Sequence, residues 1–411
     1  MKSSVGRKIL FIQHASALGG SAYSLFLLMR ELKKQGIIPE VALARPTPEL
    51  CAFYDDADFT IHRAPQIEIF THTTGGWGRL SSWKSLYQLW HTICRWRTSQ
   101  EATIQLVNAT SPDIVHLNSV VLSPSAVALQ RHNIPFVWHV RECPPFQGMR
   151  TQFIRKHLLN TRHVIFLSEY DRHEWVNGMH GEVMPNFVDY GKFALTPSRD
   201  EARKQLGIDL GLPVVLYLGG TVKIKGFYTL LQAIPEVLKT LPATLFLMPN
   251  SEIRLADKGI KKAVQQVLPY IGSGTAGQNL LKSIKEGGLG KAIKLLPHAF
   301  DVNLFLSACD LLVFPSIMPH FARPVIEASA MGRPVVGSDI GGVRELIIDG
   351  ENGILVKPGN PNELANAIIK ILNDSKLSAA MGSTGQIAAR EKYAEESYIN
   401  KILYLYQRIL N

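Results

Sequence analysis

Short apolar runs alternate with helical stretches along the whole chain. The first run, residues 8–12, is followed by a loop at 14–20 and by a segment from about 21 to 35 whose apolar residues recur at helical spacing. The same order continues through the first half, with further β-like runs at 40–43, 114–117, 136–140 and 163–167. This alternation predicts a parallel sheet with helices on both faces.

The pattern stops in a polar segment at 186–210 and then begins again. A strand at 213–218, a loop at 219–226 and a helix at 227–238 open the second half; further runs lie at 244–248, 293–296, 311–314 and 334–337. The sequence therefore predicts two α/β domains of similar size. The expected limits are 1–190 for the first domain, 191–210 for a linker, 211–388 for the second domain and 389–411 for a final helix with an apolar stripe.

Composition excludes several classes of protein. With 411 residues, 46% hydrophobic and 19% charged, the chain is long and apolar enough for two cores. The four cysteines are far apart and form no CxxC pair, which argues against a disulfide scaffold or a thiolate zinc site and fits a reducing cytoplasm. The first apolar run is too short for a signal peptide or a membrane span. We therefore expect a cytoplasmic protein.

The net charge of +10 is spread along the chain. It suits anionic partners such as phosphates or an acidic membrane surface, and it does not choose between them. No zinc-finger or RNP signature and no dense basic helix is found, so nucleic acid is not an expected partner.

Two loops carry candidate phosphate-binding features. The first contains Gly19 and Gly20 at a helix start, where glycine permits close approach of a ligand and free N–H groups attract phosphate; a mere tight turn is the alternative. The second, at 219–226, contains Lys225 just before a helix, where its charge could neutralise a diphosphate. The alternative there is a solvated lysine.

The segment 309–346 is the richest in candidate chemistry. It is expected to form a strand, a loop, a helix that carries Glu327, a second strand and a Gly341–Gly342 turn. A carboxylate near a helix start can hold the two hydroxyls of a ribose by hydrogen bonds. Service to the helix dipole is the alternative for Glu327.

Taken together, these stretches resemble the family 4 retaining glycosyltransferases. The matching stretches occur in family order across nearly the whole chain: Gly19-Gly20, 185–189 with Phe193, Lys225-Gly226, 308–327, 341–346 and 350–358. The resemblance implies an α/β protein of GT-B fold. In that fold two Rossmann-like, doubly wound domains face a cleft, and the C-terminal helix crosses back to the N-terminal domain.

The resemblance also implies roles for individual residues. A nucleotide-diphosphate sugar would lie in the cleft, with its ribose on Glu327 and its leaving diphosphate near Lys225. No metal or further cofactor is expected in the site, and transfer would retain the configuration of the sugar. The residues implied to bind the donor are Gly19, Gly20, Gly220, Lys225, His320, Phe321, Ala322, Arg323 and Glu327.

Three positions depart from the family pattern. The first glutamate of its E-x7-E motif is Pro319 here, followed by His320, which could replace the lost hydroxyl contact or be an ordinary surface histidine. The usual arginine after the strand is Gly220, so Arg323, or else Lys223, would supply that charge.

The usual N-terminal histidine of the family is the third departure, because Arg141 stands at its position. His139 lies two residues before Arg141 on the same strand. Residues two apart on a strand share a face, so both side chains are expected to reach the cleft. Lys225, Arg141 and His139 are thus the predicted catalytic residues.

The expected function is transfer of a sugar to a glycan or lipid-linked acceptor in cell-surface polysaccharide or glycolipid synthesis. Two alternatives stay open: a catalytically silent nucleotide-sugar-binding protein and a sugar-nucleotide epimerase of the same fold. The Asp56-Ala-Asp58 triplet is not expected to bind metal. A tryptophan- and arginine-bearing stretch at 77–97 fits either a core helix or peripheral contact of the N-terminal domain with the membrane inner face.

Overall fold

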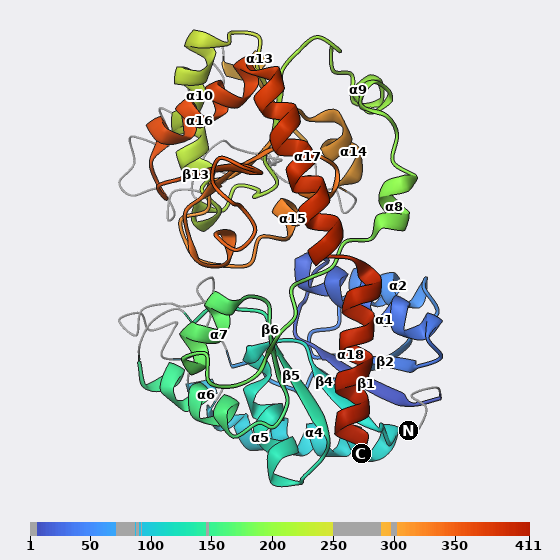
Figure 1. Cartoon of the computed structure of the whole chain (residues 1–411). Coiled ribbons are helices and arrows are strands. Elements are labelled where there is room, and N and C mark those ends of the chain that lie inside the picture. Colours follow the sequence, from blue (N-terminus) through green and yellow to red (C-terminus); the bar gives the residue numbers. More distant parts are fainter. Residues whose placement is uncertain are drawn as a thin grey trace, which may run out of the picture. The chain divides into compact units, whose positions relative to one another are not determined.

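The chain forms two compact units (Figure 1). The computed structural model describes residues 6–70, 87, 90, 91, 93–144, 148–249, 289–296 and 302–411. Unit 1 combines Met1–Phe187 with Glu395–Asn411, and unit 2 is Val188–Ala394. The predicted final helix at 389–411 is interrupted: its first residues are the end of α17 (Ser375–Lys392), which belongs to unit 2, and the rest forms α18 (Glu395–Leu410), which belongs to unit 1.

Unit 1 is built on a seven-stranded sheet in the order β3-β2-β1-β4-β5-β6-β7, and all its strand pairs are parallel. The strands are β1 (Lys8–Gln13), β2 (Ile38–Leu43), β3 (Thr60–Arg63), β4 (Ile114–Leu117), β5 (Phe136–Val140), β6 (Val164–Phe166) and β7 (Glu182–Val183).

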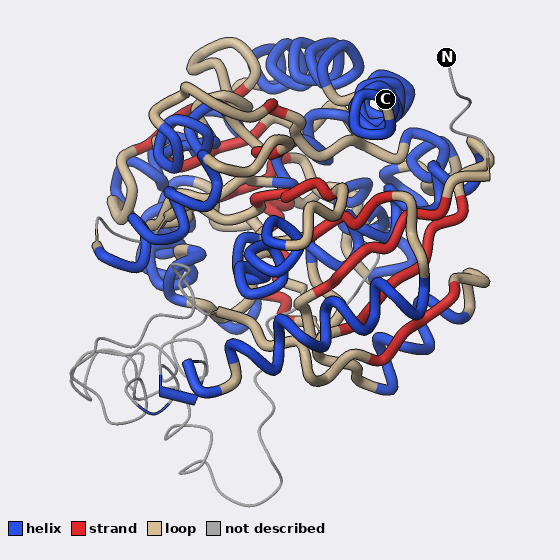
Figure 2. The backbone as a smooth tube through the Cα atoms, turned by 90° about the horizontal axis from the view of Figure 1, so that it is seen from below, coloured by secondary structure: helices blue, strands red, loops and turns tan. Residues whose placement is uncertain are grey.

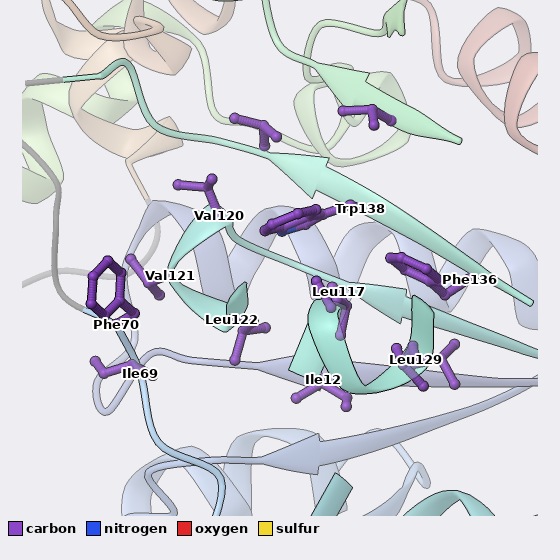
Figure 3. Packing of buried hydrophobic residues seen from close by; sticks show 14 of the residues in the cluster. Ile12, Ile69, Phe70, Leu117, Val120, Val121, Leu122, Leu129, Phe136 and Trp138 are labelled. Atoms are coloured by element: carbon purple, nitrogen blue, oxygen red, sulfur yellow. The ribbon is translucent and has the colours of Figure 1, made fainter. Parts of the chain in front are cut away.

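Helices cover both faces of this sheet, as the sequence predicts. Leu10 and Ile12 of β1 pack into one hydrophobic cluster, whereas Ile9 and Phe11 pack into another, because successive side chains of a strand point to opposite faces. The first cluster includes Trp138 of β5 (Figure 3). Its helices are α4 (Trp96–Thr110), α5 (Ser123–Arg131), α6 (Met149–Leu159) and α7 (Glu169–Val176); those of the second are α1 (Gly20–Lys34), α2 (Pro48–Asp55) and α18.

Unit 2 has the same architecture, with a six-stranded parallel sheet in the order β10-β9-β8-β11-β12-β13. Its strands are β8 (Val214–Leu216), β9 (Leu245–Met248), β10 (Ile293–Leu295), β11 (Leu311–Phe314), β12 (Val335–Ser338) and β13 (Gly353–Val356). Figure 2 shows the strands in red and the helices in blue. One face carries α10 (Phe227–Thr240) and α16 (Pro361–Asn373), and the other carries α14 (Asn303–Ala308) and α15 (Arg323–Ala330).

The remaining described elements are short connections. They are the one-turn helices η1 (Val120–Leu122), η2 (Lys223–Lys225) and η4 (Gly341–Val343), and the helices α8 (Tyr190–Ala194), α9 (Arg199–Leu206) and α13 (Leu289–Ala292). In the described part of the chain, no helix combines the length and the apolar character needed to cross a membrane.

Strand order locates the expected ligand positions within each unit. The order reverses between β1 and β4 in unit 1 and between β8 and β11 in unit 2. Open parallel sheets bind ligands beyond the carboxyl ends of the strands at such a reversal. The loops that leave these four strands are therefore the places to look for function.

Candidate functional site

The loop after β8 is pressed against the loop after β11. Gly226 has a φ of +79°, and a Cβ placed on it would lie 1.8 Å from the carbonyl oxygen of Pro315. The Ser316 hydroxyl donates to the carbonyl of Ile224 at 2.8 Å. Because glycine alone allows this backbone approach, it brings the neighbouring Lys225 onto the loop after β11.

Lys225 and His320 form the central contact of this site. Lys225 Nζ lies 2.5 Å from His320 Nε2. An ammonium group can only donate, so Nε2 is the acceptor and the ring proton is on Nδ1, which donates to the Met318 carbonyl at 2.9 Å. Burial, together with the charge of Lys225, lowers the pKa of His320 to about 3. The ring is therefore neutral at physiological pH.

The position of Lys225 has an electrostatic cost. Burial lowers the pKa of its ammonium to about 8, because a charged group loses hydration there. At pH 7 the lysine still carries its charge, and a neutral histidine holds it beyond the strand ends. His320 directs its ring nitrogens to Lys225 and Met318, so it is not an ordinary surface histidine. Its predicted contact with a sugar hydroxyl stays a prediction.

Arg323 and Glu327 pair with each other on α15. Arg323 Nε donates to Glu327 Oε1 at 2.7 Å, and their side chains are only 11% and 10% exposed. The fully buried Ala322 precedes the helix, and Phe321 packs against the core of unit 2. Glu327 lies beyond the first turn of α15, so service to the helix dipole does not explain it. A guanidinium and a carboxylate expected to bind different parts of a donor are thus joined in this structure.

The glycines of the two loops differ in what they contribute. Gly19 precedes α1 with a φ of −143° and Gly20 is its first residue; a Cβ on either would meet no atom within 4 Å. Neither a tight turn nor close packing therefore requires glycine at these two positions. Gly220 has a φ of +62°, which favours glycine for conformational reasons. Lys223, the second candidate for the missing charge, is exposed on the same loop.

In unit 1 the two predicted residues, His139 in β5 and Arg141 just after it, differ in exposure. His139 is fully buried within the strand, so its ring cannot reach a substrate, contrary to the prediction. Arg141 lies one residue beyond the strand and is half-buried. Although the strand ends at Val140, the Arg141 guanidinium comes within 3.4 Å of His139 Nε2, as expected for residues on one face.

Three neutral acceptors surround the Arg141 guanidinium. Its NH2 group donates to Asn186 Oδ1 at 2.7 Å, and its NH1 group lies 3.3 Å from Asn118 Oδ1 and 3.4 Å from His139 Nε2. Asn186 immediately precedes Phe187, the last residue of unit 1 before the chain enters unit 2. Arg141 is therefore fixed to both the sheet and the segment that leaves the unit.

Several polar residues near Arg141 at this edge of the sheet were not predicted from the sequence. The Glu142 carboxylate accepts from the backbone N–H groups of Val120 at 3.1 Å and Arg141 at 3.2 Å, and from the Ser119 hydroxyl. The sequence does contain a pattern that indicates them, because polar residues within or just after a buried strand lie at the carboxyl edge of a parallel sheet, where ligands bind. The residues missed in this way are His116, Asn118, Ser119 and Glu142.

The two remaining predictions concern unit 1. Asp58 forms an ion pair with Lys33 at 2.9 Å, and among the described residues no group of three or more metal-ligating side chains occurs. In the stretch 77–97, Trp96 packs edge-on against Phe70, whereas Trp90 is 61% exposed. Trp77, Arg79, Trp83 and Lys84 lie outside the described residues.

Two family models account for nearly the whole chain. Residues 198–387 match the model described as "Glycosyl transferases group 1", and residues 18–192 match the one described as "Glycosyltransferase Family 4". The D-inositol 3-phosphate glycosyltransferase of Corynebacterium urealyticum is 30% identical over 229 residues, which are 54% of this chain and 50% of that protein. The N-acetyl-alpha-D-glucosaminyl L-malate synthase of Bacillus anthracis is 23% identical over 58% of each chain. The matches thus span only about half the length of these relatives.

Solved structures agree in fold over the full length. Anabaena HepE in complex with UDP and glucose has a TM-score of 0.74 at 21% identity, covering 98% of this chain and 100% of that one. Sucrose-phosphate synthase from Thermosynechococcus elongatus has a TM-score of 0.72 at 19% identity, covering 98% and 99%. Together with the family matches, they show that the chain belongs to the family 4 glycosyltransferases and has the GT-B fold.

Proposed function

We propose that the chain is a retaining glycosyltransferase that moves a sugar from a nucleotide-diphosphate donor to a glycan or lipid-linked acceptor in cell-surface polysaccharide or glycolipid synthesis. The observation that carries this proposal is Lys225, a half-buried and partly desolvated cation that a neutral histidine holds beyond the strand ends at the reversal of the unit 2 sheet. A cation kept there at a cost in free energy is typical of a functional site.

Lys225 would stabilise the leaving diphosphate. When the bond between the anomeric carbon and the diphosphate oxygen breaks, negative charge develops on that oxygen, and a pre-positioned ammonium lowers the barrier. The acceptor hydroxyl forms the new glycosidic bond on the same face and passes its proton to the departing diphosphate. The charge of Lys225 would stabilise the diphosphate in place of the divalent cation that other enzymes use. We therefore expect turnover in the presence of EDTA.

Glu327 would hold the donor ribose. The Glu327 side chain is 10% exposed, and its carboxylate is oriented by Arg323 at 2.7 Å. A carboxylate can accept hydrogen bonds from two vicinal hydroxyls while its second oxygen stays with the guanidinium. Arg323, lying at the start of α15, would add positive charge on the side of the phosphates.

The donor to test first is a uridine diphosphate sugar. The similar Anabaena HepE was solved with UDP and with UDP-glucose.

We also propose that unit 1 contacts the inner face of the membrane, because Tyr87, Trp90 and Ile93 are each about 60% exposed close to Arg97 in the sequence.

The test is release of free nucleotide and formation of a glycosylated product, measured with UDP-, GDP-, ADP- and CMP-sugars and a panel of acceptors. Lys225→Ala and Glu327→Ala should each reduce turnover at least a hundredfold, about the loss of one stabilising donor in a transition state. Lys239→Ala is the control, since it removes an exposed lysine near the far end of α10, the helix that follows the loop.

The outcomes separate the remaining alternatives. Donor binding without nucleotide release for every acceptor would identify a silent binding protein, and conversion of the donor sugar with no acceptor present would identify an epimerase. Normal turnover by both Lys225→Ala and Glu327→Ala would overturn the assignment of the site.

A further inference from the structure

A line of buried rings runs from the C-terminal helix α18 to Arg141. Tyr406 Oη lies 2.8 Å from His116 Nδ1, and His116 Nε2 lies 3.2 Å from His139 Nδ1. His139 Nε2 lies 3.4 Å from the NH1 group of Arg141. The three rings are at most 1% exposed, so water cannot replace these contacts. We call these three residues the ring relay.

Arg141 fixes the direction of every hydrogen bond in the ring relay. A guanidinium can only donate, so His139 Nε2 must be an acceptor and the proton of that ring is on Nδ1. His139 Nδ1 then donates to His116 Nε2, which places the His116 proton on Nδ1. His116 Nδ1 in turn donates to the Tyr406 hydroxyl oxygen. One donor-only group thus determines two tautomers.

Both histidines carry a single proton. Burial, with the charge of Arg141 as the second cause, lowers the pKa of His116 to about 3 and that of His139 well below its usual value. The same charge also acts on Tyr398 of α18 and on His14 after β1. Burial is the main cause that raises the pKa of Tyr398 and lowers that of His14, and the Glu142 carboxylate opposes the shift of His14. The relay therefore consists of neutral rings near neutral pH, and each ring has one donor and one acceptor nitrogen.

The opposite direction is also chemically complete without Arg141. The Tyr406 hydroxyl would donate to His116 Nδ1, His116 Nε2 would donate to His139 Nδ1, and His139 would carry its proton on Nε2. Within the described residues, the Tyr406 hydroxyl has no other hydrogen-bond partner, so this direction gives its proton an acceptor. It would, however, point an N–H group at the guanidinium. The two directions are mutually exclusive, and Arg141 selects between them.

We propose that the ring relay is a positioning device for Arg141. In it the neutral His139 holds the guanidinium, and Tyr406 on the C-terminal helix stabilises the tautomers that make His139 an acceptor. The relay thereby makes the C-terminal helix part of the site in unit 1. What Arg141 touches during transfer rests on the proposed function, but the direction of the relay does not.

The first experiment reads the tautomers directly. In protein labelled with ¹⁵N-histidine, long-range ¹H–¹⁵N correlation spectra should show His116 and His139 with the proton on Nδ1. Arg141→Lys keeps a donor-only group and should preserve both tautomers. Arg141→Met should move the proton of both rings to Nε2. Nε2–H tautomers in the wild type, or tautomers that Arg141→Met leaves unchanged, would overturn the proposal.

The second experiment asks whether the relay serves catalysis. Tyr406→Phe removes the acceptor for His116 and should lower kcat/KM about tenfold by loosening Arg141, since small misplacements of such groups are costly. Tyr404→Phe is the matched control, because Tyr404 lies on the same helix and is 59% exposed. If the wild type turns over and Tyr406→Phe equals Tyr404→Phe, the positioning role is refuted. If the wild type is inactive with every donor, the proposed function is refuted. The proposal on the ring relay would then be tested by the tautomer measurement alone.

Discussion

Replacing Lys225 by methionine should make the stability of unit 2 less dependent on pH. Burial lowers the pKa of Lys225 from 10.5 to about 8. The folded state therefore holds this proton less tightly than the unfolded state, and the wild type gains stability as the pH rises from 8 towards 10.5. Between pH 7 and pH 9.5 this gain amounts to about 2 kcal/mol. The figure is an upper bound, because the ammonium keeps some access to solvent.

The assay is urea unfolding at pH 7 and pH 9.5, and the quantity compared is the difference in unfolding free energy between the wild type and Lys225→Met. All six tryptophans precede residue 188, so tryptophan fluorescence follows unit 1, whereas circular dichroism follows both units. We expect this difference in unfolding free energy to change by up to 2 kcal/mol between the two pH values. The change should occur in the circular dichroism transition of unit 2, which tryptophan fluorescence does not report. Lys223→Met, at the exposed lysine of the same turn, should show no such change. A difference for Lys225→Met that stays constant with pH would refute the argument that burial of this charge is costly.

Two further predictions concern the packing of unit 2. Gly226→Ala should destabilise unit 2 by about 3 kcal/mol or more, since the new Cβ would lie 1.8 Å from the Pro315 carbonyl oxygen. The control is Gly350→Ala, where φ is similar at +81° but a Cβ would meet no atom within 4 Å; this variant should cost only about 1 kcal/mol. Arg203→Leu should cost about 3 kcal/mol in urea unfolding, because the fully buried guanidinium donates to the carbonyl oxygens of Ala308 at 2.9 Å and Leu212 at 2.8 Å, which lose this donor. Asp310 loses one partner but keeps its ion pair with Arg199 at 3.0 Å. Equal losses for the two glycine variants, or an unchanged midpoint for Arg203→Leu, would contradict these contacts.

Local patterns determined the architecture because they depend only on neighbouring residues. The period of two in strands and of 3.6 in helices, with glycines after the apolar runs, predicted two doubly wound sheets, and both are present. The chain position of Lys225, directly after a strand and before a helix, likewise required no tertiary information. These features are fixed by spacing along the chain.

The ends of elements were less predictable. The final helix divides at residues 393–394, because the backbone there leaves one unit and enters the other. Arg141 lies outside β5 for a similar reason, since the strand ends at Val140. A strand end depends on where pairing with neighbouring strands stops, and a single segment does not encode that.

The sequence alone therefore determined the fold class, the loops that would carry chemistry and the residue types available in them. Only the tertiary structure decided which of these side chains meet. His116 and Tyr406 are 290 positions apart and come into contact because α18 packs beside β4. Lys225 reaches His320 because Gly226 lets one loop close on another. Such pairs depend on strand order, register and the space between elements, which follow from the packing of the whole chain.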